Sequence, residues 1–173
     1  MQVMPDPAYA RSVSTSEPQW LTPEERSAWL TLSRLFETLP AALDAQLQRD
    51  AGLNYYQYVV LAMLSEQAEH ALPMSRLSTI TAGSLSRLSN VVKRLEGRGY
   101  VRRCADPADR RVSVVTLTDE GWSSLVAAAP AHVTHVRELV VDALSPTQLA
   151  ALREAALLVL DRVDPEGHTA IPE

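Results

Sequence analysis

The sequence predicts a mostly α-helical protein in which a helix-turn-helix and a β-hairpin lie between two long helical regions. Three observations support this fold class. Apolar residues recur every three or four positions over most of the chain, which is the periodicity of amphipathic helices. A glycine-containing turn separates two helical stretches between residues 75 and 98. Two β-rich stretches around a polar loop follow directly.

The N-terminal part of the chain is predicted to be an arm followed by a long helix. Residues 1–19 contain prolines and little apolar periodicity, so we expect a flexible arm. The helix should begin after Thr22, an N-cap residue type that is followed by a proline at the first helical position. Its apolar face extends to about residue 50, and Gly52 should end it. Pro40 lies inside this helix and is expected to bend or split it.

A helix-turn-helix is predicted within residues 53–117. Asn54 has the spacing of an N-cap, and the apolar residues after it indicate a well-buried helix. A short helix over residues 75–80 and a longer helix from Ser84 to Arg98 should follow, joined by a tight turn. The longer helix has one apolar stripe at i, i+3, i+4 and i+7, which leaves its opposite side open to solvent.

The β-hairpin completes this lobe. Residues 100–104 and 112–117 favour strands and flank a polar, proline-containing loop with a basic tip. A hairpin directly after a helix-turn-helix is called a wing. The lone cysteine, Cys104, lies in the first of these strands and is expected to be a small buried residue.

The C-terminal region, residues 119–164, is predicted to form two helices. The first should bend near Pro130, and Ser145 begins a capping box that opens the second. The last helix is apolar on more than one side, so it needs a partner, and a second copy of the chain is our first expectation. We therefore expect residues 20–50 and 119–164 to form dimerisation helices, with residues 165–173 as a tail.

Charge is distributed unevenly along the chain. The 173 residues include 16 Lys and Arg against 21 Asp and Glu, a net charge of −5. The segment from Arg76 to Arg111 holds nine basic and three acidic residues, a net charge of +6, so the rest of the chain carries −11. A basic block in an acidic protein is typical of a polyanion-binding site, although a solvated charged surface would give the same pattern.

Several classes of protein are excluded or disfavoured. One cysteine cannot form an internal disulfide, and no apolar run approaches the roughly 18 residues that span a bilayer. The N-terminal residues lack the features of a signal peptide, so we expect a cytoplasmic protein with no membrane partner. Nucleotide-binding loops, nucleophile elbows and Cys/His metal clusters are missing from the sequence, so no enzyme activity, cofactor or metal is expected.

The exposed side of the helix that follows Ser84 carries residue types that read DNA. Arginine pairs with guanine, asparagine with adenine, and serine reaches base edges or phosphate. Two arginines at the hairpin tip suit a minor groove, whose negative potential attracts guanidinium groups. Asp109 is placed to hold the guanidinium of Arg111, although a plain surface ion pair of little energetic value is the simpler alternative.

Three stretches of the chain resemble the MarR (multiple antibiotic resistance regulator) transcription factors. They are GLNYYQYVVLAML, MSRLSTITAGSLSRLSNVVKRLEGRGYVRR and DPADRRVSVVTLTDEG. The most specific features are Asp109-x-Arg111 followed by Leu117-Thr118-x-x-Gly121, and the R-L-E-x-R-G stretch that begins at Arg94. The resemblance extends over about residues 24–163.

This resemblance implies a homodimer that binds a pseudo-palindromic double-stranded DNA operator and usually represses transcription. Arg111 would enter the minor groove, braced by Asp109, and the helix after Ser84 would enter the major groove. The expected DNA-binding residues are Ser75, Arg76, Ser84, Ser86, Arg87, Ser89, Asn90, Lys93, Arg94, Asp109, Arg110 and Arg111. The rival interpretation is a winged-helix adaptor that binds proteins and not DNA.

Many members of this family release DNA when a small aromatic ligand binds near the dimerisation helices. Aromatic residues that could contact such a ligand are Trp29, Tyr55, Tyr56, Tyr58 and Trp122. Aromatic residues at helical spacing are more often part of a core, so both interpretations stay open.

Overall fold

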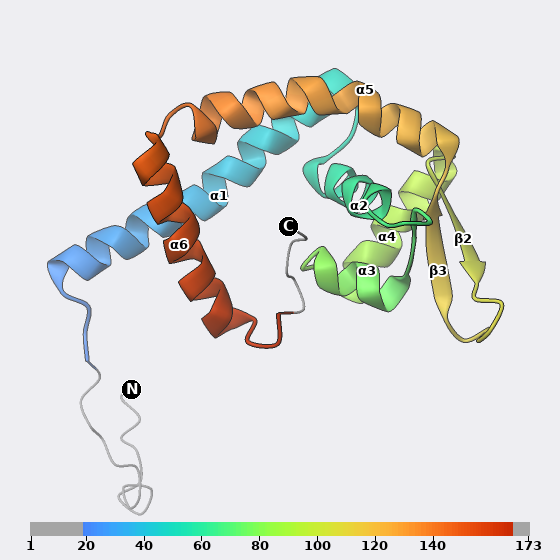
Figure 1. The fold of residues 1–173 in the computed structure, drawn as a ribbon, viewed down its shortest axis with the longest axis horizontal. Helices are drawn as coiled ribbons and strands as arrows, with labels where there is room; N and C mark the ends of the chain where they lie inside the picture. Colours follow the sequence, from blue (N-terminus) through green and yellow to red (C-terminus); the bar gives the residue numbers. More distant parts are fainter. Residues whose placement is uncertain (1–18, 168–173) are drawn as a thin grey trace, which may run out of the picture. The chain divides into compact units, whose positions relative to one another are not determined.

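The structure is a computed structural model that describes residues 19–167 (Figure 1). Residues 1–18 of the predicted arm and residues 168–173 of the predicted tail lie outside this range. The chain divides into two compact units, one ending at Glu37 and the other beginning at Thr38. The elements are α1 (Pro23–Ala51), α2 (Tyr55–Ser65), β1 (Ala71–Pro73), α3 (Met74–Ile80), α4 (Leu85–Gly97), β2 (Val101–Ala105), β3 (Ser113–Leu117), α5 (Asp119–Val136), the π-helix η2 (Arg137–Val141) and α6 (Pro146–Val163).

Helix α1 begins as the sequence predicts. Thr22 Oγ1 accepts a hydrogen bond from the Glu25 backbone N–H at 3.2 Å, and the Glu25 carboxylate accepts one from the Thr22 N–H at 2.8 Å. The helix ends before Gly52, whose positive φ of 61° suits glycine. The expected split at Pro40 is wrong, because α1 is continuous through it. A proline removes only one helical hydrogen bond, and the surrounding turns retain theirs.

The second unit contains the predicted helix-turn-helix and wing. Helices α2, α3 and α4 pack on one small antiparallel sheet, in which β3 lies between β1 and β2. The fully buried side chains of this core come from all of these helices and from β3: Val60, Leu61, Leu64, Leu77, Leu88, Val92, Leu95 and Val115. The fold is therefore mostly α, as predicted.

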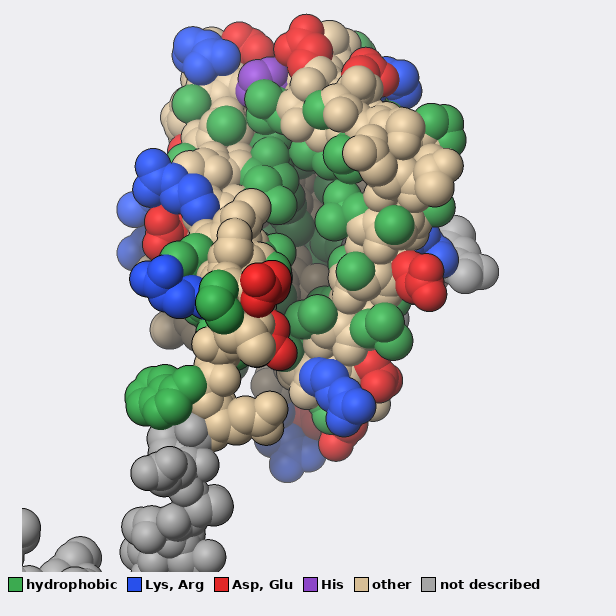
Figure 2. Space-filling model, turned by 90° about the vertical axis from the view of Figure 1, so that its left-hand side faces the viewer, with side chains coloured by type: hydrophobic (Ala, Val, Ile, Leu, Met, Phe, Trp, Pro, Cys, Tyr) green, Lys and Arg blue, Asp and Glu red, His purple; other side chains and the backbone are tan. Residues whose placement is uncertain are grey.

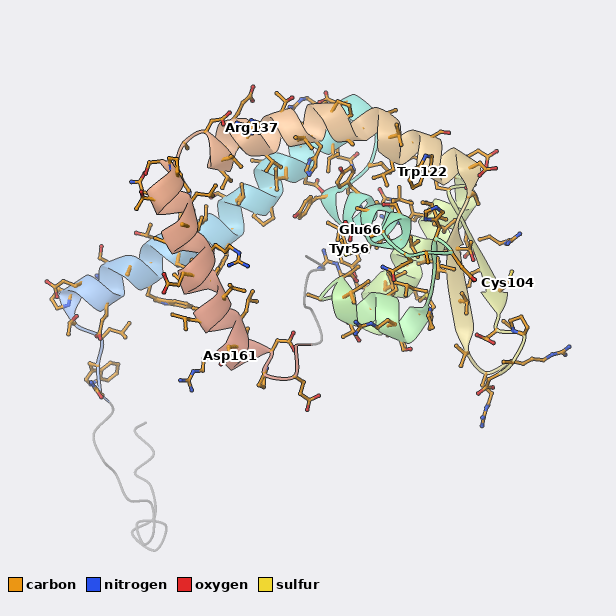
Figure 3. The ribbon with its side chains drawn as sticks, viewed as in Figure 1. Tyr56, Glu66, Cys104, Trp122, Arg137 and Asp161 are labelled. Atoms are coloured by element: carbon orange, nitrogen blue, oxygen red, sulfur yellow. The ribbon has the colours of Figure 1, made fainter. Side chains whose placement is uncertain are left out.

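The wing is the hairpin of β2 and β3, whose register pairs Val101 with Leu117 and Ala105 with Ser113 (Figure 1). Strand β1 was not predicted, and it pairs with β3 so that Leu72 lies opposite Val115. Cys104 is exposed on β2, which corrects the expectation of a buried cysteine (Figure 3). Only the first residue of β2 is buried, since the rest of this strand lies outside the core.

Helix α5 is continuous through Pro130, and an irregularity follows at its C-terminal end. The chain changes to a π-helix at Arg137, and the Asp142 N–H donates to the carbonyl of Arg137, five residues earlier, at 2.8 Å. Helix α6 opens with the predicted capping box between Ser145 and Gln148. None of the described helices is long and apolar enough to cross a membrane.

Helix α6 contributes no buried residue to the described part of the chain. Its apolar side chains are open to solvent, with Leu158 67% and Val163 71% exposed. Figure 2 shows hydrophobic side chains lying at the surface on this side of the molecule. An apolar helix of this kind is stable only when another surface covers it.

Candidate nucleic-acid interface

Helix α4 has two chemically distinct sides. Its buried side consists of Leu88, Val91, Val92 and Leu95. Its open side contains hydroxyl, amide and cationic groups, of which Ser89 is partly buried and the others are exposed: Ser86, Arg87, Ser89, Asn90, Lys93 and Arg94. This arrangement follows the apolar stripe in the sequence, because burying the stripe fixes which residues face outward.

The beginning of α4 is ordered by Ser84. Its hydroxyl accepts a hydrogen bond from the Arg87 N–H at 3.2 Å and lies 3.1 Å from the hydroxyl of Ser86. The Arg87 guanidinium lies over the ring of Tyr56 from α2, 4.2 Å from its centroid. Sequence reasoning missed this pair, because the two residues are 31 positions apart and no local pattern connects them.

A depression of about 500 Å³ lies beside this side of α4. It is lined by Asp44, Gln48, Asn54, Tyr56, Arg87, Asn90, Val91 and Arg94. Asp44 has a structural role: its carboxylate accepts a hydrogen bond from the Tyr55 N–H, at 2.8 Å, at the start of α2.

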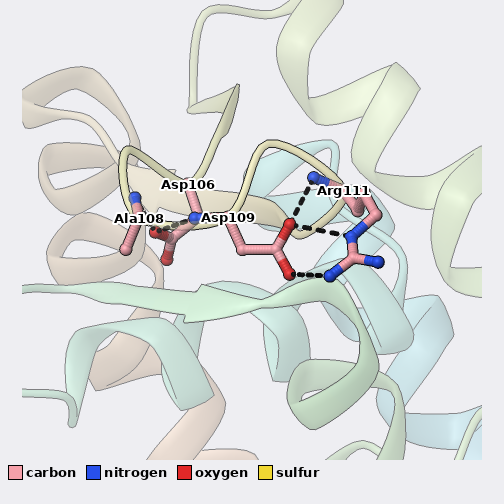
Figure 4. Close-up of polar contacts among 4 residues, drawn as sticks. All are labelled: Asp106, Ala108, Asp109 and Arg111. Atoms are coloured by element: carbon pink, nitrogen blue, oxygen red, sulfur yellow. Dashed lines mark hydrogen bonds and ion pairs between the residues drawn. The ribbon is translucent and has the colours of Figure 1, made fainter.

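The tip of the wing is held by two aspartates (Figure 4). Asp106 accepts hydrogen bonds from the N–H groups of Ala108 and Asp109, at 2.7 and 3.3 Å. Asp109 accepts from Arg111 three times: from the backbone N–H at 3.0 Å, and from Nε and Nη2 at 3.1 Å each. These bonds from the side chain and backbone of Arg111 lower the pKa of Asp109. The Arg111 side chain is 91% exposed, so its guanidinium is oriented and open to solvent.

The remaining predicted residues also lie at the surface. Ser75 and Arg76 are exposed in the first turn of α3, and Arg110 is exposed beside Arg111. Two further exposed cations, Arg102 and Arg103 on β2, were not predicted as site residues. The two consecutive arginines in the sequence of that strand could have indicated them as site residues. Arg103 forms an ion pair with Glu96 of α4, in which its Nε lies 3.7 Å from the carboxylate.

The candidate ligand-binding aromatics are found in several surroundings. Tyr55 and Tyr58 lie against the ring of His132 on α5, with centroids 6.2 and 4.3 Å away. Trp122 lies 5.0 Å from the ring of His70. Trp29 is 56% exposed in the first unit.

His132 is a buried polar residue that sequence reasoning did not place in a site. Its Nδ1 lies 3.2 Å from Oε1 of Gln46 on α1, and Gln46 in turn donates to Asp50 at 2.9 Å. Burial, and secondarily the nearby His135, lower the pKa of His132. Within residues 19–167, no three His, Cys, Asp or Glu side chains are grouped closely enough to hold a metal ion.

Together, these features define a winged helix-turn-helix in which α4 and the wing present cations to solvent. Residues 51–112 match the sequence model of the MarR family. The fold is similar to that of Sco3205, a MarR family transcriptional regulator from Streptomyces coelicolor solved in complex with DNA. That comparison has a TM-score of 0.83 and 40% identity, and it covers 87% of this chain and 94% of Sco3205. The chain therefore belongs to the MarR family of transcriptional regulators.

Two regulators from Escherichia coli are also similar in sequence. The HTH-type transcriptional regulator PapX is 32% identical over 88 residues, which are 51% of this chain and 54% of PapX. The chain thus matches about half the length of PapX. The transcriptional repressor MprA of strain K12 is 29% identical over 132 residues, which are 76% of this chain and 72% of MprA.

Proposed function

We propose that this protein represses transcription by binding a pseudo-palindromic double-stranded DNA operator as a homodimer in the cytoplasm. The observation that carries the proposal is the open side of α4, which gathers six polar or cationic residues. The one acidic residue of this helix, Glu96, is partly buried and lies 3.7 Å from Arg103. Such a surface can approach a polyanion without repulsion and can form hydrogen bonds with base edges. The similar protein MprA is named a transcriptional repressor, which supports repression over activation.

In this proposal, each part of the lobe has its own role in binding. Helix α4 enters the major groove, where Arg87 and Asn90 read bases and Lys93 and Arg94 contact the backbone. Arg111 enters the minor groove, held by Asp109. Ser75 and Arg76 contact phosphate. The cations give an affinity that falls steeply as the salt concentration rises, because bound counterions are released from the DNA.

The proposed dimer uses residues 20–50 and 119–164, and residues 53–117 form the DNA-binding lobe. Support comes from the exposed apolar surface of α6 and from exposed Trp29 and Phe36 on α1. A two-fold dimer would present two copies of α4 to two half-sites, with centres about one helical turn, or roughly 10 bp, apart.

A small aromatic ligand is the proposed regulator of DNA binding. The observation that favours it is the grouping of Tyr55 and Tyr58 around His132, where helices α1, α2 and α5 meet. Aromatic rings and a buried imidazole can stack on an aromatic acid and bind its polar groups. The other two candidates from the sequence have no such support, since Trp122 lies beside His70 and Trp29 belongs to the first unit.

Selection of bound sequences from random duplex DNA tests the proposed function. The expected result is a two-fold symmetric motif with half-sites about 10 bp apart and a binding constant that falls steeply with salt. Binding with no sequence preference, or no binding in dilute buffer, would instead favour the adaptor that binds proteins. Aromatic acids can then be screened for release of the selected site.

A further inference from the structure

We propose that Tyr56 is a positioning residue for DNA reading: its ring holds the Arg87 guanidinium and thereby sets the sequence preference at one base pair in each half-site. The inference rests on the proposed DNA-binding function. It assigns a role to a side chain of α2, a helix that otherwise contributes to the core of the lobe (Figure 3).

The Tyr56 side chain is fixed at its hydroxyl end. Its oxygen lies 2.9 Å from Oγ1 of Thr81, a buried residue at the end of α3. Thr81 donates its own hydroxyl proton to the carbonyl of Leu77 at 2.7 Å. A hydroxyl has one proton, so Tyr56 is the donor of the shared hydrogen bond. The ring is therefore tied to the structure that leads into α4.

The turn before α4 is built around this ring. A Cβ on Gly83 would overlap the Tyr56 hydroxyl and would lie 2.8 Å from Cζ, so only glycine lets the turn pass so closely. The turn is also tied to α3, because the Ser78 hydroxyl donates to the Gly83 carbonyl at 2.6 Å. These contacts join the Tyr56 ring and the first turn of α4 in one local structure.

Arg87 is the third residue of α4, and its Cζ lies 4.2 Å from the centroid of the Tyr56 ring. Residues in the first turn of a reading helix are those that reach base edges. A guanidinium stacked on a ring uses its face, whereas its N–H donors point outward in its own plane. The contact with Tyr56 therefore restricts the guanidinium while leaving an N–H edge open to guanine O6 and N7.

Restriction of the Arg87 guanidinium should raise both the affinity for the operator and the discrimination between bases at the position that Arg87 reads. A long arginine side chain loses rotamer freedom when it binds a base, and part of that loss has already occurred when the ring holds it. The opposite possibility is that the ring draws Arg87 away from DNA. In that case removal of the ring would strengthen binding, so the two possibilities predict changes of opposite sign.

A double-mutant cycle tests the proposal on the full-length protein with its selected operator. Arg87→Ala first identifies the base pair at which preference is lost. Tyr56→Leu should weaken operator binding about 3- to 10-fold and reduce discrimination at the same base pair. In the Arg87→Ala background, Tyr56→Leu should have no further effect at that base pair, because the coupled partner is gone.

Two control variants isolate the role of the ring. Tyr56→Phe keeps the ring and should keep the discrimination. Tyr100→Leu removes the ring from the second such pair, Arg98 over Tyr100 at 4.5 Å, and should leave preference at the Arg87 base pair intact. Three results would each overturn the proposal. They are equal discrimination in Tyr56→Leu and wild type, additive losses in the cycle, and tighter operator binding by Tyr56→Leu.

A measurement on the wild-type protein does not depend on how well Tyr56→Leu folds. The ring should shift the Arg87 δ-methylene protons upfield in the NMR spectrum, with Arg87→Lys used for assignment. Absence of that shift would also overturn the proposal. If wild type selects no DNA sequence, the proposed function fails as a whole. If wild type selects an operator and the cycle is additive, only the role of Tyr56 fails.

Discussion

Asp109 holds one edge of the Arg111 guanidinium through two parallel hydrogen bonds, with Nε donating to Oδ1 and Nη2 donating to Oδ2, each at 3.1 Å. The Arg111 backbone N–H donates to the same carboxylate. Surface ion pairs contribute little to stability, and this one is at the tip of a loop. Its geometry is better explained as orientation of the cation than as stabilisation of the fold.

Replacement of Arg111 by alanine should therefore affect binding much more than folding. We expect the free energy of operator binding to become about 1–3 kcal/mol less favourable. The thermal unfolding midpoint should be unchanged, because the side chain is exposed. Fluorescence anisotropy with the operator duplex at physiological salt measures the change. Arg102→Ala removes the same charge from β2 and should cost less. Wild-type affinity in Arg111→Ala would remove the wing from the proposed interface.

Asn90→Ala should alter sequence preference at one position in each half-site. Asn90 is exposed in the middle of α4, where an amide can pair with adenine N6 and N7. The expected cost is about 1–3 kcal/mol on the preferred base and little on the other three. Binding to operators with each base at that position measures it. An equal loss on every duplex would identify Asn90 as a backbone contact.

Local chemistry explains which parts of this fold the sequence could predict. The caps predicted at Asn54 and Ser145 accept hydrogen bonds from the N–H groups three positions ahead, so these helix starts could be predicted from short spacings. Ser84 and Thr118 accept the same bonds at the starts of α4 and α5. The Asp109–Arg111 pair was readable for the same reason.

Features that depend on distant partners were not predictable. Strand β1 has three residues and pairs with β3, more than forty positions later, so it has no alternating pattern of its own. The contact of Tyr56 with Arg87 requires α2 and α4 to pack first. The π-helix that begins at Arg137, after α5 has continued through Pro130, was also not predicted.

His132 makes stability depend on pH. Burial lowers its pKa below the ordinary value of 6.5, so protons bind more readily to the unfolded chain than to the folded one. The contribution of His132 to the free energy of unfolding is fully present above pH 6.5. It decreases as the pH falls below 6.5 toward the lowered pKa of His132. Thermal unfolding at fixed protein concentration should show this decline, and His132→Gln should reduce it.

The matched control for this pH dependence is His135→Gln, on the same helix. This variant should retain most of the decline, because His132 still titrates. A decline of wild-type size in His132→Gln would assign the pH dependence to other groups.

The exposed apolar surface of α6 predicts that the C-terminal region holds the dimer together. Deletion of the residues after Asp142 should convert the dimer to a monomer while the winged lobe stays folded, since α6 supplies none of its buried side chains. Sedimentation velocity and circular dichroism measure the two effects. Leu158→Glu should weaken the dimer as well, because it would bury a charge with no partner in the interface.

Leu85→Glu is the control for that substitution. Leu85 is an exposed leucine on α4, outside the proposed dimerisation helices, and the same change of charge there should leave the dimer intact. A dimer that survives both the deletion and Leu158→Glu would place the contact between copies elsewhere. The apolar side chains of α6 would then need a different partner, because a helix that exposes Leu158 and Val163 to this extent is an unfavourable surface for an isolated chain in water.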